Sequence, residues 1–242
     1  MAPTSQGVLR NDRFHPDPRR VAWQLDLDPR ASPAGGRGHQ VFTPTLTGLG
    51  ERSHLLSRDV GLDTHVADVA NLMIWEDLRD IVLVGASYGG IVARHVADRM
   101  PDRIRSLVYL DAFVPENGKA LFDYLPDSGE SMRQLAVAHG DGWKIPPIPA
   151  SVFAVNAADA AWVDRQCTMH PLSSCEAPAR LSAACDGIAN IGYILASGHD
   201  GPFGQFYAKA RERRWWLEKL ACGHDVTLDM PNELTALLLQ HT

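Results

Sequence analysis

The chain has 242 residues, of which 45% are hydrophobic and 21% are charged, and its formal net charge at pH 7 is −6. A chain of this length forms one large α/β domain or two small ones, and we interpret it as one domain with an insertion. The negative net charge argues against nucleic acid as a partner, because such binding needs a clustered basic face. No uncharged apolar run has the length that crossing a membrane requires, so we expect no membrane partner.

The first forty residues contain no apolar segment of the kind found in secretory signals, so we expect a cytoplasmic protein. The chain has four cysteines, and none of them forms a Cys-x-x-Cys pair. We expect free thiols, as is usual in a reducing compartment. Cys167, Cys175 and Cys185 lie near His170 in the sequence, which leaves a metal site as a minor alternative; our prediction is that the protein binds no metal.

Residues 1–37 differ from the rest of the chain, because prolines and arginines alternate with aspartates and no strand or helix period is sustained. We predict an irregular segment there. Beyond it, hydrophobic strands alternate with amphipathic helices, which predicts a parallel sheet flanked by helices. The first elements that we expect are a strand over 41–43, a Gly-rich loop over 44–54 and a helix that is N-capped by Asp63 and ends within 75–78. Further strands are expected over 81–84, 104–110, 191–196 and 215–220. Further helices are expected directly after residue 88 and over 203–213 and 231–240.

The turn after the strand at 81–84 is the main functional motif and consists of Gly85-Ala86-Ser87-Tyr88-Gly89. In a Gly-x-Ser-x-Gly turn between a strand and a helix, the serine hydroxyl is exposed at the top of the sheet, beside the positive end of the helix dipole. The pentapeptide alone is a weak signal, and its context makes it specific. We therefore predict that Ser87 is a nucleophile and that the backbone N–H of Tyr88 is one donor to the oxyanion.

A serine nucleophile needs a base that takes its proton and a carboxylate that orients the base. His224, after the last predicted strand, is the expected base, and we expect the other nine histidines, His54 and His199 among them, to be surface or structural residues. Asp111 and Asp200 each follow a predicted strand, at the end where catalytic groups collect in α/β sheets. The residue pattern alone leaves both as candidates for the acid.

Residues 115–180 interrupt the alternation with a long segment that is rich in proline and alanine. We predict a helical cap over this range, inserted into a core formed by residues 38–114 and 181–242. Its aromatic residues Phe122, Trp143 and Phe153 are candidates for a substrate-binding wall, and packing in the core of the cap is the alternative interpretation.

Several stretches resemble bacterial α/β-hydrolases related to the plant methylesterase and hydroxynitrile lyase group; they are the turn around Ser87, residues 42–54, residues 107–115 and residues 223–225. The resemblance covers roughly residue 38 to the C-terminus. It implies the α/β-hydrolase fold and cofactor-free hydrolysis of a carboxylic ester of a small acid, with aromatic acids among the candidates. It also favours Asp111 over Asp200, because such relatives regularly carry the run Tyr-Leu-Asp-Ala-Phe-Val-Pro.

The chain departs from this family at its N-terminus, where the family has a hydrophobic strand and a His-Gly loop that gives the second oxyanion donor. Residues 19–29 stand in that place. Shifted by one nucleotide, codons for Ala22-Trp23-Gln24 can encode His-Gly-Ser, so we hypothesise a compensated frame slip over residues 19–37. With the sequence as written, we expect the loss of a central strand and of one oxyanion donor, which raises the barrier by about 3 kcal/mol.

Three functions are therefore open. The leading one is a serine esterase that uses Ser87, His224 and Asp111 on a small-molecule ester. The second is a lyase in which Ser87 and His224 act as general acid and base. The third is a non-catalytic small-molecule binder or pseudoenzyme, favoured by the atypical N-terminus, since one scaffold hosts many chemistries. The oligomeric state is open, with a homodimer among the alternatives.

Overall fold

A five-stranded sheet with strand order β1-β2-β3-β6-β7 forms the centre of the computed structural model, which describes residues 23–25 and 41–241. Neighbouring strands are parallel from β2 to β7, and β1 pairs with β2 in the antiparallel direction. The strands are β1 (Trp23–Leu25), β2 (Ile81–Ser87), β3 (Ile104–Ala112), β6 (Asn190–Ala196) and β7 (Trp216–Leu220). The sequence-based prediction of a mostly parallel sheet is confirmed.

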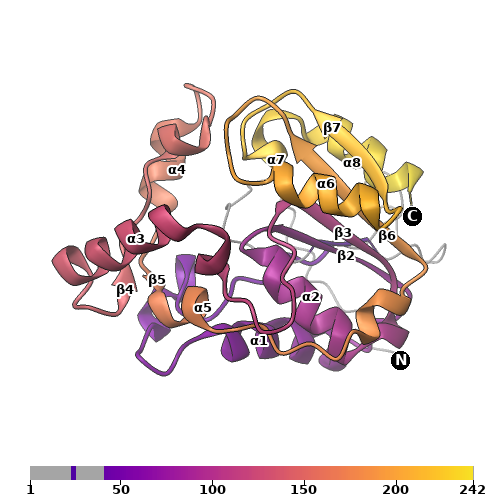
Figure 1. Cartoon of the computed structure of the whole chain (residues 1–242), viewed down its shortest axis with the longest axis horizontal. Coiled ribbons are helices and arrows are strands. Elements are labelled where there is room, and N and C mark those ends of the chain that lie inside the picture. Colours follow the sequence, from indigo (N-terminus) through magenta and orange to yellow (C-terminus); the bar gives the residue numbers. More distant parts are fainter. Residues whose placement is uncertain (1–22, 26–40, 242) are drawn as a thin grey trace, which may run out of the picture.

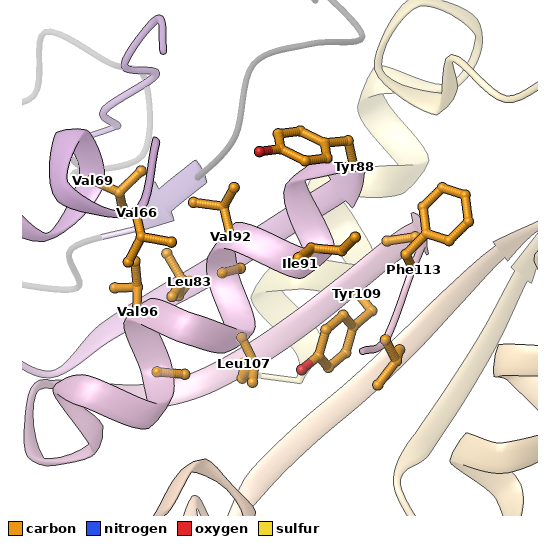
Figure 2. Packing of buried hydrophobic residues seen from close by; sticks show 14 of the residues in the cluster. Val66, Val69, Leu83, Tyr88, Ile91, Val92, Val96, Leu107, Tyr109 and Phe113 are labelled. Carbon is orange, nitrogen blue, oxygen red and sulfur yellow. The ribbon is translucent and has the colours of Figure 1, made fainter. Parts of the chain in front are cut away.

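Helices cover both faces of this sheet, because alternate residues of each buried strand point to opposite faces. Leu83 and Leu107 pack under α1, α2 and α6, whereas Val82 and Val108 pack under α7 and α8. Figure 2 shows the first face, where valines of α1 and α2 lie over Leu83 and Leu107. The helices are α1 (Leu62–Trp75), α2 (Gly89–Arg99), α6 (Gly204–Glu212), α7 (Val226–Asp229) and α8 (Pro231–Gln240).

Residues 115–180 form short helices and a second, two-stranded sheet, which lie to one side of the central sheet (Figure 1). The elements are a 3-10 helix over Leu121–Tyr124, α3 (Pro126–His139), β4 (Lys144–Ile145), a 3-10 helix over Ala150–Phe153, α4 (Ala160–Gln166), β5 (His170–Pro171) and α5 (Leu172–Glu176). The limits of the cap remain a proposal. Among the helices that the structure describes, none combines the length and the apolar character that crossing a bilayer requires.

Three local predictions were wrong. Residues 41–43 form no strand: they pair with none of the described strands, and Val41 is left 41% exposed. Asp63 is not the N-cap of α1: Gly61 occupies that position, and Asp63 is the second residue of the helix, where its Oδ1 accepts a hydrogen bond from Nη2 of Arg99 at 2.9 Å. The irregular segment predicted over 1–37 contains Trp23–Leu25, which instead forms the strand β1, because these residues pair in the antiparallel direction with 82–84 of β2. The rest of that segment and most of the proposed frame slip fall outside the described residues.

Gly90 determines how closely α2 approaches β3, and it provides the first testable prediction. A Cβ at this position would stand 2.3 Å from the carbonyl oxygen of Phe113 and 2.9 Å from Cβ of Ala112. Because the backbone cannot move aside cheaply, we expect Gly90→Ala to lower the free energy of unfolding by about 3 kcal/mol in urea titrations. Gly204→Ala is the matched control, since no atom lies within 4 Å of its added Cβ. Equal stability of the two variants would contradict the prediction.

Candidate active site

Polar side chains gather where four neighbouring parallel strands end. Ser87 ends β2 and Asp111 lies one residue before the end of β3. His199 and His224 lie in the loops that follow β6 and β7. Since β2, β3, β6 and β7 are adjacent in that order, their carboxyl ends form one edge of the sheet, which is where α/β proteins bind ligands.

Ser87 lies in a strained turn. Its φ is +51°, a left-handed conformation that costs a residue with a side chain about 1–2 kcal/mol. The pairing of β2 with β3 shifts register between Ala86 and Ser87, so that Ser87 lies opposite Ala112 and next to the strand that carries Asp111. Gly85 makes the turn possible, because a Cβ there would stand 2.6 Å from the carbonyl oxygen of Gly89. This is the geometry of a nucleophile elbow.

Asp111 is fully buried and accepts three hydrogen bonds. Its Oδ2 atom lies 2.6 Å from Nδ1 of His224 and 2.7 Å from Nε2 of His199. Its Oδ1 atom accepts the backbone N–H of Ala196 at 3.1 Å. These partners satisfy both oxygens of a carboxylate that water does not reach, as a buried charge requires.

The imidazole of His224 lies between two phenyl rings. The ring of Phe203 is parallel to it within 7° at a centroid distance of 4.7 Å, and the ring of Phe153 stacks on it at 5.3 Å. The backbone N–H of His224 also donates to the carbonyl oxygen of Phe153 at 3.0 Å. Since Asp111 holds the Nδ1 proton, Nε2 is the ring nitrogen that can accept a proton from another group.

The other acidic candidates near His224 lie elsewhere. Asp200 is exposed. Asp225, which we set aside, is buried and accepts a hydrogen bond from Oγ1 of Thr227 at 3.2 Å. The position of His199 was not predicted, since we expected a surface or structural role for it. Its side chain is only 7% exposed and donates a hydrogen bond to Asp111. A signal was available: His199 lies in the same loop after β6 that made Asp200 a candidate.

Tyr88 is the N-cap of α2, so its backbone N–H lies at the helix end where backbone donors lack intrahelical partners. Its buried side chain points away from the edge of the sheet (Figure 2), and its hydroxyl donates to Nδ1 of His65 at 2.8 Å. Nε2 of His65 in turn donates to the carbonyl oxygen of Thr47 at 3.0 Å. Burial lowers the pKa of His65 and raises the pKa of Tyr88 well above its ordinary value, so both side chains are held neutral.

The three aromatic residues chosen from residues 115–180 occupy different surroundings. Phe122 is buried in the main hydrophobic cluster, with the guanidinium carbon of Arg133 at 4.9 Å from its ring centre, so core packing accounts for it. Phe153 stacks on His224. Trp143 borders an open pocket of about 480 Å³, which is lined by Ser53, Leu56, Trp143, Lys144, Pro147, Cys167, Thr168 and Met169.

We also considered whether the site could bind a metal ion. In the described ranges 23–25 and 41–241, the residues close enough together to do so are Asp111, His199 and His224, whose possible ligand atoms lie within 4.8 Å of one another. The N–O separations of 2.6 and 2.7 Å are hydrogen-bond lengths. Ligands about 2.0–2.1 Å from a tetrahedral ion stand roughly 3.3 Å apart, so the arrangement fits shared protons better than an ion. The cysteines that the sequence analysis considered for a metal site lie outside this cluster.

A serine on a strained strand-to-helix turn, with a His–Asp pair at the same edge of a parallel sheet, defines the α/β class of hydrolases. A sequence model of the alpha/beta hydrolase family matches residues 14–237, and the chain belongs to this family. The resemblance to α/β-hydrolases that the motifs indicated is therefore confirmed.

The relatives include an esterase. The chain is 43% identical over 212 residues to the carbendazim hydrolyzing esterase of Nocardioides sp. (strain SG-4G), a match that covers 83% of this chain and 87% of the relative. The family, the fold and this relative make the chain a carboxylic ester hydrolase.

Two solved structures show the same fold. An extracellular α/β-hydrolase from a Paenibacillus species, described as sharing structural and functional homology with tobacco salicylic acid binding protein 2, has a TM-score of 0.73 at 24% identity and covers 84% of this chain and 88% of its own. Polyneuridine aldehyde esterase has a TM-score of 0.68 at 16% identity and covers 86% of this chain and 89% of its own. At these identities the likeness concerns the fold alone.

Proposed function

We propose that the protein is a serine esterase that cleaves small carboxylic esters through an acyl-enzyme on Ser87, with His224 as the base and Asp111 as the orienting acid. The observation that carries this proposal is the 2.6 Å contact between Nδ1 of His224 and the buried carboxylate of Asp111. That contact fixes the tautomer in which Nε2 is free to take a proton. The exposed position of Asp200 further supports Asp111 as the acid.

In the proposed reaction, Nε2 of His224 removes the proton of the Ser87 hydroxyl while Oγ attacks the ester carbonyl carbon. The carbonyl oxygen becomes an oxyanion, to which the backbone N–H of Tyr88 donates. When the C–O bond to the alcohol breaks, Nε2–H returns the proton to the leaving alkoxide. Water then attacks the acyl-enzyme with the same base and releases the acid and Ser87. The family resemblance implies a second oxyanion donor from a loop in whose place residues 19–29 stand, and with the sequence as written we expect that donor to be lost.

For the substrate, we propose a small carboxylic ester with an aromatic group. The ring of Phe153 supports it, because it stacks on His224 and provides an apolar surface next to the base. Trp143 remains a candidate for a contact with a more distant part of the substrate. Its pocket includes Met169, which precedes His170 in the sequence. The ring of His170 lies 4.9 Å from the ring of Tyr88. Carbendazim, which the name of the 43% identical relative specifies, is the first compound to test.

We further propose a cytoplasmic location, which the buried thiols of Cys175, Cys185 and Cys222 support, although one protein of similar fold is described as extracellular.

A fluorophosphonate that modifies only activated serines tests this proposal. We expect one adduct in the intact-protein mass, mapped by peptide analysis to Ser87, and none in Ser87→Ala. A burst of product during ester turnover separates an esterase from a lyase. The mass of the unmodified protein also tests whether residues 19–37 are as written. A folded protein of the expected mass that takes up no label would overturn the esterase proposal and favour the non-catalytic binder.

A further inference from the structure

We propose that His199 is a positioning residue that controls the basicity of His224 by donating a hydrogen bond to the same oxygen of Asp111. This inference rests on the proposed function, since it concerns the base of that reaction. The observation behind it is that Oδ2 of Asp111 lies 2.7 Å from Nε2 of His199 and 2.6 Å from Nδ1 of His224.

Sharing one oxygen divides its charge between two imidazoles. An orienting carboxylate stabilises the imidazolium that forms when the base takes a proton, and it does so most strongly when its charge is directed at that base alone. A second N–H on Oδ2 withdraws part of that charge. Nε2–H of His199 therefore makes His224 a weaker base than it would be with an unshared carboxylate.

The three hydrogen bonds also fix the plane of the carboxylate. Oδ1 is held by the backbone N–H of Ala196 at the end of β6, and both lone pairs of Oδ2 are engaged by the two imidazoles. Since Asp111 is fully buried, no water replaces a lost donor without opening the site. Removal of the His199 donor thus frees Oδ2 to interact with His224 alone.

The His199 ring is itself held in place. Gly201 lies against it, because a Cβ at position 201 would stand 2.3 Å from Cε1 and 2.7 Å from Nδ1 of His199. The ring of Phe203 lies 6.1 Å away and the ring of His224 lies 5.4 Å away. Asp111 and His224 are ionisable groups beside His199, the thiol of Cys222 lies near Asp111 with a pKa that burial raises to about 12, and the neighbouring Asp200 is exposed. A ring held in this way keeps its Nε2 directed at Asp111.

The test compares His199→Phe, which keeps a ring and removes the donor, with His199→Gln, whose amide nitrogen reaches nearly the same point as Nε2. The titration of His224 is followed by NMR in the full-length protein, with His224→Gln to assign its signal. We expect the pKa of His224 to rise by about one unit in His199→Phe and to return toward the wild-type value in His199→Gln. The acid limb of the pH profile of kcat/KM should shift in the same direction.

An unchanged titration of His224 in His199→Phe, with stability alone reduced, would overturn the proposal and leave His199 a structural role. The NMR readout does not depend on turnover. If the wild-type protein hydrolyses no ester and takes up no fluorophosphonate, the proposed function fails while the effect of His199 on His224 is still measured. Urea titrations of both variants identify any that fails to fold, and a folded His199→Gln that titrates like His199→Phe would also contradict the proposal.

Discussion

Asp111→Asn is expected to lower kcat for ester hydrolysis about 10⁴-fold, the size of effect seen when a triad carboxylate is replaced by its amide. An amide nitrogen in the place of Oδ2 can donate to both imidazoles only if Nδ1 of His224 and Nε2 of His199 give up their protons. His224 then carries its proton on Nε2 and cannot act as the base. In the opposite orientation the amide nitrogen faces the N–H of Ala196, a donor against a donor. We also expect the free energy of unfolding to fall by about 2 kcal/mol, because hydrogen bonds to a buried charge become neutral ones.

The matched control for this prediction is Asp200→Asn, which makes the same chemical change at the exposed alternative acid. We expect its kcat to stay within about twofold of wild type, in line with a surface substitution that breaks no buried contact. Steady-state kinetics on one activated ester, with urea titrations of both variants, checks both expectations. A large loss of kcat in Asp200→Asn, with kcat of Asp111→Asn near that of wild type, would show that Asp200, in the loop after β6, is the orienting acid.

Ser87→Ala is expected to abolish ester hydrolysis, with a loss in kcat on the order of 10⁶-fold, because the other members of the site cannot act without a nucleophile. Ser87→Gly should be equally inactive and should separate chemistry from backbone strain. Since φ of Ser87 is +51°, glycine relieves a strain that alanine retains, and we expect Ser87→Gly to be about 1 kcal/mol more stable than Ser87→Ala.

Turnover assays and urea titrations on the same preparations measure the two effects of Ser87 independently. Residual activity of more than about one per cent in Ser87→Ala would show that another group carries the chemistry. Equal stability of the alanine and glycine variants would instead mean that the turn relaxes when the hydroxyl is removed, and would leave the assignment of the nucleophile intact.

The sequence predicted those features that depend on strand order and period. Four aliphatic residues before Gly85 and a helical repeat after it define the elbow. Asp111 and His224 meet because Asp111 lies at the carboxyl end of β3 and His224 lies in the loop after β7 of the same parallel sheet. The prediction of a strand over 41–43 was wrong because a strand forms only where a neighbouring strand pairs with it, and residues 41–43 have no such pairing in the described part of the chain.

The contribution of the loops could not be predicted in this way. His199 and Asp200 are adjacent, and which of them turns toward Asp111 depends on the path of the loop after β6, on which strand period carries no information. Phe203 stacks on His224 for the same reason, although it lies far from His224 in the sequence. Asp63 was misplaced by two residues, which is within the usual uncertainty of a helix end.

The hydrogen-bonded chain from Thr47 through His65 to Tyr88 supports the turn at Ser87 with groups that carry no charge. Because burial moves the pKa of His65 below its ordinary 6.5 and that of Tyr88 well above 10.0, neither side chain changes charge between those two values. This pair therefore adds no change of charge at the start of α2 over more than three decades of proton concentration. The support beneath the turn that carries Ser87 contributes no pH dependence of its own in that interval.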